Sequence, residues 1–262
     1  MLTDSIKEKL FNTALIAAQS SGKYIHEKLN TTLKIDYKGR ANMVTQVDRN
    51  SEKIITDLIK ENFPEHQILA EETTPVNNES LFKWIIDPLD GTTNFIHGFP
   101  YFAVSIALEY NDEIIMGVVL DPERNELFSA IKERGAYMNK KPIHVSSIKN
   151  LSASFLSTGF PYELNEYFYK NIELFRAFFE KSQDIRRVGS AAIDLCYVAC
   201  GRFEGFWEFD LNPWDVAAGA LIVTEAGGKM SDFSGRDFSI YEKQVLATNS
   251  LIEKEMLEVL FI

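Results

Sequence analysis

Hydrophobic positions in the first third of the chain recur at the spacing of one helix face. This spacing predicts an amphipathic helix over residues 4–29, where Ser5 and Glu8 also have the spacing of a capping box. A second helix is expected over residues 48–62, and a short apolar run at residues 67–70 is typical of a strand. The apolar stripe of the first helix consists of Ile6, Leu10, Ala14, Ala17 and Ala18.

A different pattern marks the middle of the chain. Trp84, Ile85 and Ile86 form an apolar run without alternation, which indicates a strand that is covered on both faces. Pro88 cannot donate a hydrogen bond to a neighbouring strand, so we expect the strand to end there, with Asp87 at its C-terminal end. Further strands follow with turn signals between them, and they predict an antiparallel meander. These strands span residues 104–108, 114–120 and 126–131.

The second half of the chain alternates short strands with helical segments, as layered α/β proteins do. We therefore expect an α+β N-terminal half and an α/β C-terminal half. Because no repeat or low-complexity linker separates them, we predict a single domain over residues 1–262, with an N-terminal subdomain of about 1–150 and a C-terminal subdomain of about 151–262. Strands are predicted at 154–158, 185–188, 203–209 and 245–248, and helices at 164–179, 191–199, 216–226 and 251–260.

The composition is that of an ordinary globular enzyme, with 262 residues, 45% of them hydrophobic and 25% charged. The net charge of −11 argues against a nucleic-acid partner, because nucleic-acid binding needs clustered Lys and Arg. Cys196 and Cys200 are spaced for one helix face and suit neither a disulfide nor a zinc site. The N-terminus lacks a leader pattern and no apolar run approaches about 18 residues, so we expect a cytoplasmic protein without membrane contact.

Two carboxylates follow the Trp84 strand on a tight turn. Asp87 and Asp90 lie three residues apart, and Gly91 leaves the backbone after them open to close approach. Hard oxygen ligands next to free backbone N–H groups suit a divalent metal and a phosphate together. A metal would also supply the positive charge that an acidic protein needs to hold an anionic phosphate. The turn therefore predicts metal-assisted phosphate chemistry.

Two more acidic residues are candidates for the same site. Glu71 follows the strand at residues 67–70, and Asp215 lies in the first turn of a helix that Asn212 and Pro213 begin. By itself, Asp215 is explained as a partner of the helix dipole, worth about 0.3–1 kcal/mol. Next to the turn described above it becomes a candidate ligand. Three Asp and one Glu supply enough charge for two magnesium ions about 3.5–4 Å apart.

Hydroxyl and backbone groups complete the candidate chemistry. Thr92 with Asp48 can orient and deprotonate an attacking water, although Asp48 alone is also an ordinary helix-start residue. Gly91, Thr92 and Thr93 are expected to open a helix whose N–H groups form an anion site. A second strand-to-helix turn follows two arginines and has Ser190 as its N-cap. A phosphate site and an ordinary capped helix both explain this second turn.

Together these segments resemble the inositol monophosphatase family. Its first motif corresponds to residues 84–95, Trp-Ile-Ile-Asp-Pro-Leu-Asp-Gly-Thr-Thr-Asn-Phe, and its second to residues 214–219, followed by residues 225–228. Residues 71–72 and 44–48 also occur in the family's order. The resemblance implies a layered αβαβα sandwich of the inositol-monophosphatase and fructose-bisphosphatase type. It further implies magnesium-dependent hydrolysis of a phosphate monoester with two or three Mg²⁺ per active site, inhibition by Li⁺, and a homodimer.

The resemblance also implies roles for individual residues. Thr92, supported by Asp48, matches the position that activates water, and Glu71 matches a catalytic residue as well as a metal ligand. Glu208 matches a position that binds substrate hydroxyls, although a plain exposed strand carboxylate explains it equally well. Asn42 departs from the Asp that many members have before the Val-Thr pair. The residues that match metal ligands are Glu71, Asp87, Asp90, Asp215 and, through its carbonyl, Leu89. Those that match phosphate and substrate contacts are Gly91, Thr92, Thr93, Gly189, Ser190, Ala191, Glu208 and Asp215.

A competing class of phosphatase shares part of the first motif. Enzymes of the haloacid-dehalogenase type use Asp-x-Asp-Gly-Thr with the first Asp as nucleophile, and Asp90, Gly91 and Thr92 fit that pattern. Pro88 stands at the nucleophile position, and proline cannot attack phosphorus. We therefore expect direct attack by a metal-activated water and no phosphoenzyme.

The identity of the phosphate ester stays open at this point. Residues 93–100 resemble the inositol-phosphatase branch, which favours inositol monophosphate or a related small polyol or sugar phosphate. Fructose 1,6-bisphosphate, NADP, histidinol phosphate and 3'-phosphoadenosine phosphate are alternatives with the same chemistry, because pocket loops set the choice. A regulatory protein-interaction role is an alternative from a different class, and the complete set of candidate ligands favours the enzyme.

Overall fold

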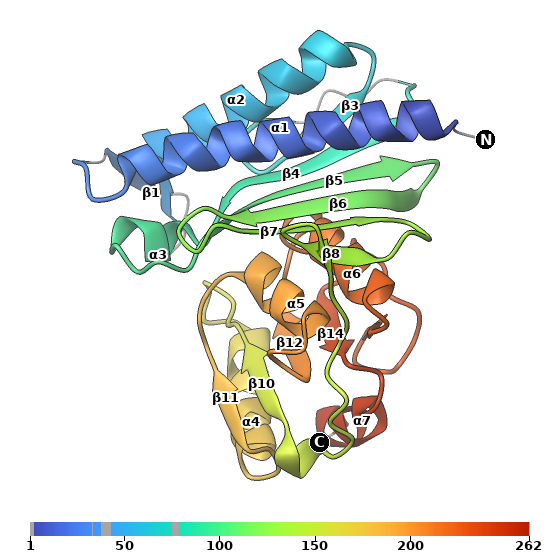
Figure 1. The fold of residues 1–262 in the computed structure, drawn as a ribbon. Coiled ribbons are helices and arrows are strands. Elements are labelled where there is room, and N and C mark those ends of the chain that lie inside the picture. The colour runs from blue at the N-terminus through green and yellow to red at the C-terminus, as the bar shows by residue number, and fades with distance from the viewer. Residues whose placement is uncertain (1–2, 33, 38–42, 75–78, 262) are drawn as a thin grey trace.

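A computed structural model describes residues 3–32, 34–37, 43–74 and 79–261, so Asn42 lies outside the described residues. Two main sheets and their helices stack in five layers, in the order αβαβα that the family resemblance implies (Figure 1). The helices are α1 (Asp4–Lys28), α2 (Gln46–Asn62), α3 (Thr92–Ile96), α4 (Glu166–Phe179), α5 (Ala191–Ala199), α6 (Pro213–Glu225) and α7 (Glu253–Leu260). The strands are β1 (Ile35–Tyr37), β2 (Met43–Thr45), β3 (Gln67–Ala70), β4 (Phe82–Asp90), β5 (Ala103–Tyr110), β6 (Glu113–Asp121), β7 (Glu126–Ile131), β8 (Ala136–Met138), β9 (Lys141–Pro142), β10 (Phe155–Thr158), β11 (Asp184–Arg186), β12 (Gly205–Phe209), β13 (Lys229–Ser231) and β14 (Gln244–Thr248).

Helix α1 begins at Asp4 as predicted, whereas its cap and the start of α2 differ from the predictions. The capping box expected at Ser5 is wrong, because Thr3 caps α1 and accepts the N–H of Ile6. Ile6, which was predicted to lie on the apolar stripe, is 45% exposed and does not join the buried residues of α1. Helix α2 begins two residues early because Thr45 forms a capping box with Asp48. No helix in the described ranges is long and apolar enough to cross a membrane.

The first sheet has seven strands in the order β3-β4-β5-β6-β7-β8-β9. All its neighbours are antiparallel except β3 and β4, so the predicted meander is confirmed. Ile86 packs into the core under α1 and α2, whereas Ile85 packs into a central core shared with α5 and α6. Strand β4 is thus covered on both faces, as its unbroken apolar run predicts.

Strand β4 does not end at Pro88, contrary to the prediction. Its pairing with β5 shifts register between Asp87 and Asp90 and then resumes at Asp90. The missing N–H of Pro88 falls inside this irregular stretch, where it interrupts no ladder bond. The Pro88 carbonyl accepts the Ser51 hydroxyl at 2.6 Å, so this backbone group is also satisfied.

The second sheet has five strands in the order β11-β10-β12-β14-β13. Strand β10 runs parallel to β11 and β12, and β14 runs antiparallel to β12 and β13. Helices α5 and α6 lie between the two sheets, and α4 and α7 cover the outer face (Figure 1). The predicted strands and helices of this half are confirmed with small shifts at their ends, while β13 was not predicted. Both halves contribute to the central core, for example through Ile85 and Phe206, and the division into two subdomains remains a prediction.

Candidate active site

The two Asp residues of the first motif project from the irregular end of β4. The Leu89 N–H donates to Asp87 Oδ1 at 2.9 Å and holds that carboxylate against the turn. Asp90 Oδ2 accepts the Ser190 hydroxyl at 2.6 Å and the Ala192 N–H at 2.8 Å. The first sheet and the start of α5 therefore meet at Asp90.

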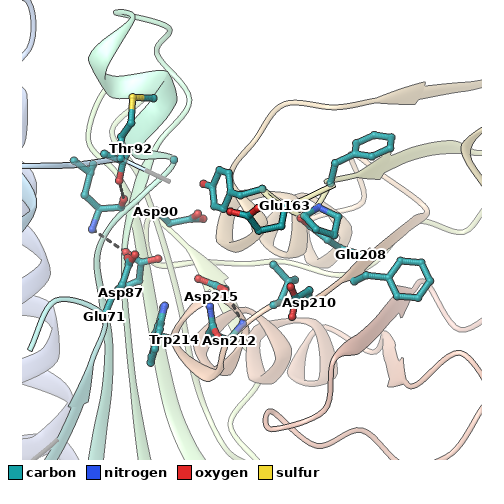
Figure 2. A pocket seen from close by; sticks show the side chains of 18 residues that line it. Glu71, Asp87, Asp90, Thr92, Glu163, Glu208, Asp210, Asn212, Trp214 and Asp215 are labelled. Atoms are coloured by element: carbon teal, nitrogen blue, oxygen red, sulfur yellow. Dashed lines mark hydrogen bonds between the residues drawn. The ribbon is translucent and has the colours of Figure 1, made fainter. Parts of the chain in front are cut away.

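Glu71 and Asp215 reach the same cavity by different routes. The parallel pairing of β3 with β4 carries Glu71 to the side of Asp87. Asp215 is fixed in the first turn of α6, where its Oδ2 accepts the Asn212 N–H at 2.7 Å, so the predicted helix start is confirmed. Figure 2 shows these carboxylates together with Asp90 around one opening between the two sheets.

Burial raises the pKa values of the three Asp residues in this cluster, and neighbouring carboxylates raise those of Asp87 and Asp215 further. Burial raises the pKa of Asp87 well above its ordinary value, and the charges of the three neighbouring carboxylates raise it further. Burial, followed by the charge of Asp90, does the same to the pKa of Asp215. Burial raises the pKa of Asp90 to about 6, although hydrogen bonds from Ser190 and from backbone N–H groups oppose the change. Such a cluster is unfavourable without a cation to offset its charge.

The donors in this cavity suit magnesium in type and in charge. The cavity has a volume of about 270 Å³, and no Lys or Arg of the described chain lines it. Its charged donors are carboxylate oxygens, which magnesium prefers. Leu89 lines the same cavity, and its carbonyl oxygen lies 3.0 Å from Thr92 Oγ1. Among the described residues, no three His, Cys, Asp or Glu side chains lie close enough together to form a ready-made metal site.

Thr92 and Asp48 form the pair that the sequence predicts. Thr92 Oγ1 donates to Asp48 Oδ1 at 2.7 Å. The other oxygen of Asp48 accepts the hydroxyl and the N–H of Thr45, at 2.6 and 2.8 Å. Asp48 therefore completes the capping box of α2 and also contacts the site through Thr92. Burial raises the pKa of Asp48, against the hydrogen bonds from Thr45 and Thr92, which makes the carboxylate a stronger base.

Helix α3 begins at the glycine of the first motif. Gly91 is left-handed, with φ 88°, and a Cβ there would lie 2.9 Å from the Tyr101 carbonyl oxygen. Glycine therefore satisfies both the backbone conformation and the space. Thr92 and Thr93 follow as the first helical residues, so the helix opening predicted at Gly91 is confirmed. Anion binding by their N–H groups remains a prediction.

A second cavity, of about 410 Å³, adjoins the first and shares Asp90, Glu208 and Asp215 with it. Thr93 and residues 189–191 line this cavity, whereas the predicted contacts Gly91 and Thr92 line the first cavity. Glu208 is buried in β12, which rules out the alternative of an exposed strand carboxylate. Burial raises the pKa of Glu208 well above its ordinary value.

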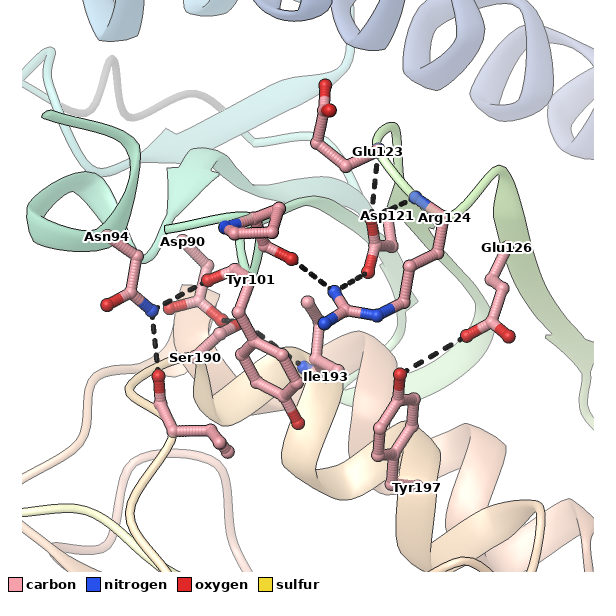
Figure 3. A network of polar contacts seen from close by, with 12 residues as sticks. Asp90, Asn94, Tyr101, Asp121, Glu123, Arg124, Glu126, Ser190, Ile193 and Tyr197 are labelled. Atoms are coloured by element: carbon pink, nitrogen blue, oxygen red, sulfur yellow. Dashed lines mark hydrogen bonds and ion pairs between the residues drawn. The ribbon is translucent and has the colours of Figure 1, made fainter. Parts of the chain in front are cut away.

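Three residues beside the site were not predicted. Asn94 donates through its amide to the Tyr101 carbonyl at 2.7 Å and to carbonyls just before α5 at 2.8 and 3.2 Å (Figure 3). Ser51 and Glu52 lie one turn after Asp48 on α2 and contact backbone groups of the site. Their signal in the sequence is a polar pair at i+3 and i+4 from Asp48, on a face that is otherwise apolar.

A layered αβαβα sandwich with a carboxylate cluster between its sheets is the arrangement expected of the phosphatase class that the first motif resembles. The chain belongs to the inositol monophosphatase family, whose family model matches residues 6–261. This membership identifies it as a phosphatase of that family.

Individual proteins support the same assignment. The chain is 41% identical over 257 residues to Nus factor SuhB of Pseudomonas aeruginosa, with 95% of each chain covered. It is 40% identical over 256 residues to the chloroplastic phosphatase IMPL1 of Arabidopsis thaliana, covering 95% of this chain and 69% of that protein. The crystal structure of the extragenic suppressor protein suhB from Bartonella henselae matches with a TM-score of 0.93 and 38% identity, over 96% of this chain and 98% of that one.

Proposed function

We propose that this chain is a magnesium-dependent hydrolase of phosphate monoesters, with inositol monophosphate or a related small polyol or sugar phosphate as substrate. The proposal rests on the cluster of carboxylates around one cavity, which no Lys or Arg of the described residues lines. Their mutual repulsion favours occupation by a divalent cation. The residues that would hold Mg²⁺ are Glu71, Asp87, Asp90, Asp215 and, through its carbonyl, Leu89.

The attacking water is activated by a short proton path. Bound Mg²⁺ would supply positive charge to the phosphate and acidify the water that attacks it. Thr92 accepts a proton from this water while its own hydroxyl proton passes to Asp48 Oδ1, 2.7 Å away. The raised pKa of Asp48 suits it as the final acceptor. Glu71, beside Asp87, orients the same water. Because phosphorus is attacked directly, no covalent intermediate forms.

The two cavities divide the substrate between them. The phosphate is placed at the start of α3, where Gly91 permits close approach and the N–H groups of Thr92 and Thr93 are offered. The alcohol extends into the second cavity along residues 189–191. Glu208 hydrogen-bonds its hydroxyls, because a carboxyl group with a raised pKa can retain its proton and both donate and accept.

Release of inorganic phosphate from inositol 1-phosphate, measured with Mg²⁺ and with EDTA, tests this function. We expect turnover with Mg²⁺ only, and none in an Asp90→Asn variant. Fructose 1,6-bisphosphate, NADP, histidinol phosphate and 3'-phosphoadenosine phosphate complete the panel and identify the preferred alcohol. Absence of metal-dependent turnover on every one of these esters would refute the proposal.

Two further properties belong to the same proposal. Li⁺ is expected to inhibit, because it would displace a weakly held Mg²⁺ from the carboxylate cluster. A homodimer is expected because two-fold dimers are the commonest assembly, and light scattering on the purified protein measures it.

A regulatory protein-interaction role is the second candidate. It is favoured by one observation, the name Nus factor that the Pseudomonas relative carries. The two candidates differ in their dependence on the site: Asp90→Asn should abolish hydrolysis but leave a purely regulatory contact intact. The absence of a nucleic-acid partner remains a prediction from the acidic composition.

A further inference from the structure

Three polar residues occupy the buried face of α2. Asp48, Ser51 and Glu52 have exposed fractions of 1%, 0% and 2%, whereas the other buried positions of the helix are hydrophobic. Charged side chains are rarely buried to this extent without a dedicated partner. Spacings of three and four residues place all three side chains on one side of the helix.

Each of these side chains contacts a different segment of the active site. Asp48 accepts the hydroxyl at the start of α3. Ser51 Oγ donates to the Pro88 carbonyl at 2.6 Å, in the turn between the two Asp residues of the first motif. Glu52 Oε2 accepts the Glu72 N–H at 2.8 Å. One helix face therefore supports the proton path, the turn and the segment after β3.

The contact of Glu52 lies one residue from a proposed metal ligand. The Glu71 N–H donates to the Ile86 carbonyl at 3.3 Å, which continues the pairing of β3 with β4. The next N–H, that of Glu72, is directed to Glu52. The chain therefore turns away from the sheet immediately after Glu71, and the backbone is held on both sides of it. This restraint limits the directions in which the Glu71 side chain can leave the backbone.

We propose that Glu52 is a positioning residue that aims Glu71 at the metal through the N–H of Glu72. The inference rests on the proposed function, because it takes Glu71 as a ligand of Mg²⁺. The role requires an oxygen acceptor at the end of a side chain of this length, and it does not require a charge. We therefore expect Gln at this position to retain the positioning role and an apolar residue of similar length to lose it.

The test compares Glu52→Gln with Glu52→Met, using Mn²⁺ as the probe and electron paramagnetic resonance to measure the free ion. We expect Glu52→Met to raise the Kd for Mn²⁺ by about 10–100-fold, the usual effect of losing a group that orients a ligand. Glu52→Gln should stay within about 3-fold of wild type, because the acceptor is kept. Asp57→Asn, on the exposed face of the same helix, is the matched control and should leave Mn²⁺ binding unchanged.

Kinetics supply a second readout that a general structural defect would not give. In Glu52→Met, the Mg²⁺ concentration for half-maximal activity should rise, while the KM for inositol 1-phosphate at saturating Mg²⁺ stays near that of wild type. Circular dichroism checks folding of each variant. If Glu52→Met does not fold, Glu52→Ala takes its place, since it removes the acceptor without adding a large apolar group.

Different results overturn different parts of the reasoning. Mn²⁺ affinity in Glu52→Met equal to that of wild type would overturn the positioning role. Equal weakening in Glu52→Gln and Glu52→Met would also overturn it, because the charge and not the acceptor would then matter. If the wild-type protein itself fails to bind Mn²⁺, the proposed function falls together with the inference.

Discussion

Asp90→Asn tests the electrostatics of the site because it changes charge and very little else. Asn has nearly the same shape, and its carbonyl oxygen can accept the hydrogen bonds that Ser190 and Ala192 donate to Asp90, while the N–H groups of Ala191 and Gly91 lose a charged acceptor. The substitution removes a buried negative charge that raises the pKa values of Asp87 and Asp215. We therefore expect it to abolish turnover and, in metal-free buffer, to stabilise the folded protein.

The size of this stabilisation follows from the pKa of Asp90. Burial raises that pKa from 3.8 to about 6. At about 1.4 kcal/mol per pH unit, an ionised Asp90 destabilises the folded protein by at most about 3 kcal/mol at pH 7. The destabilisation develops as the pH rises from 3.8 to about 6, because the folded state then holds more protons than the unfolded state. Screening and weaker hydrogen bonds to Asn reduce the expected gain to about 1–2 kcal/mol, or roughly 2–4 °C in Tm.

Scanning calorimetry of wild type and Asp90→Asn, with EDTA and then with excess Mg²⁺, measures the effect. Wild type should gain about 2.7 kcal/mol when Mg²⁺ is at 100 times its Kd, and the variant should gain much less, so the order of the Tm values reverses. Asp57→Asn removes the same charge from an exposed pair with Lys53 and should change stability by no more than about 0.5 kcal/mol. A lower Tm for Asp90→Asn in EDTA would refute the repulsion argument. An equal gain from Mg²⁺ would refute the role of Asp90 as a ligand.

Three further predictions concern the proton path, the turn and the pH dependence of stability. Thr92→Val should lower kcat by about 10²–10⁴-fold in a phosphate-release assay, because Asp48 loses its link to the water, and an unchanged kcat would contradict that path. Gly91→Ala should lower the free energy of unfolding by about 1–3 kcal/mol, since φ is 88° and the new Cβ would lie 2.9 Å from the Tyr101 carbonyl oxygen; an unchanged urea midpoint would argue against this strain. Burial lowers the pKa of His66 from 6.5 to about 4, so the unfolded state binds the proton more readily and stability should fall as the pH drops from 6.5 towards 4. The His66→Gln variant should lose this part of the pH profile in thermal unfolding, and a wild-type slope in it would exclude His66 as the cause.

Local sequence patterns predicted most of the secondary structure because each depends on neighbours along the chain. The apolar run at Trp84 correctly predicted a strand that is buried on both faces. Asn212 and Pro213 correctly predicted the residue at which α6 begins. One error was local, and the other came from the pairing of two strands. Ser5 has capping-box spacing, but Thr3 competes with it from two residues earlier and caps the helix. Pro88 lacks an N–H, but a register shift lets β4 continue past it.

The sequence by itself determined the candidate chemistry of the turn from Asp87 to Thr92, since the residue types and their spacing are local facts. It also excluded a nucleophilic Asp, because Pro88 occupies that position. Only the tertiary structure decided which segments meet around this turn. The Ser190 hydroxyl donates a hydrogen bond to Asp90, and Glu52 of α2 accepts one from the N–H of Glu72, the residue after Glu71. The physical reason is that such contacts join residues far apart in the chain, and they exist only once the layers pack and bury them.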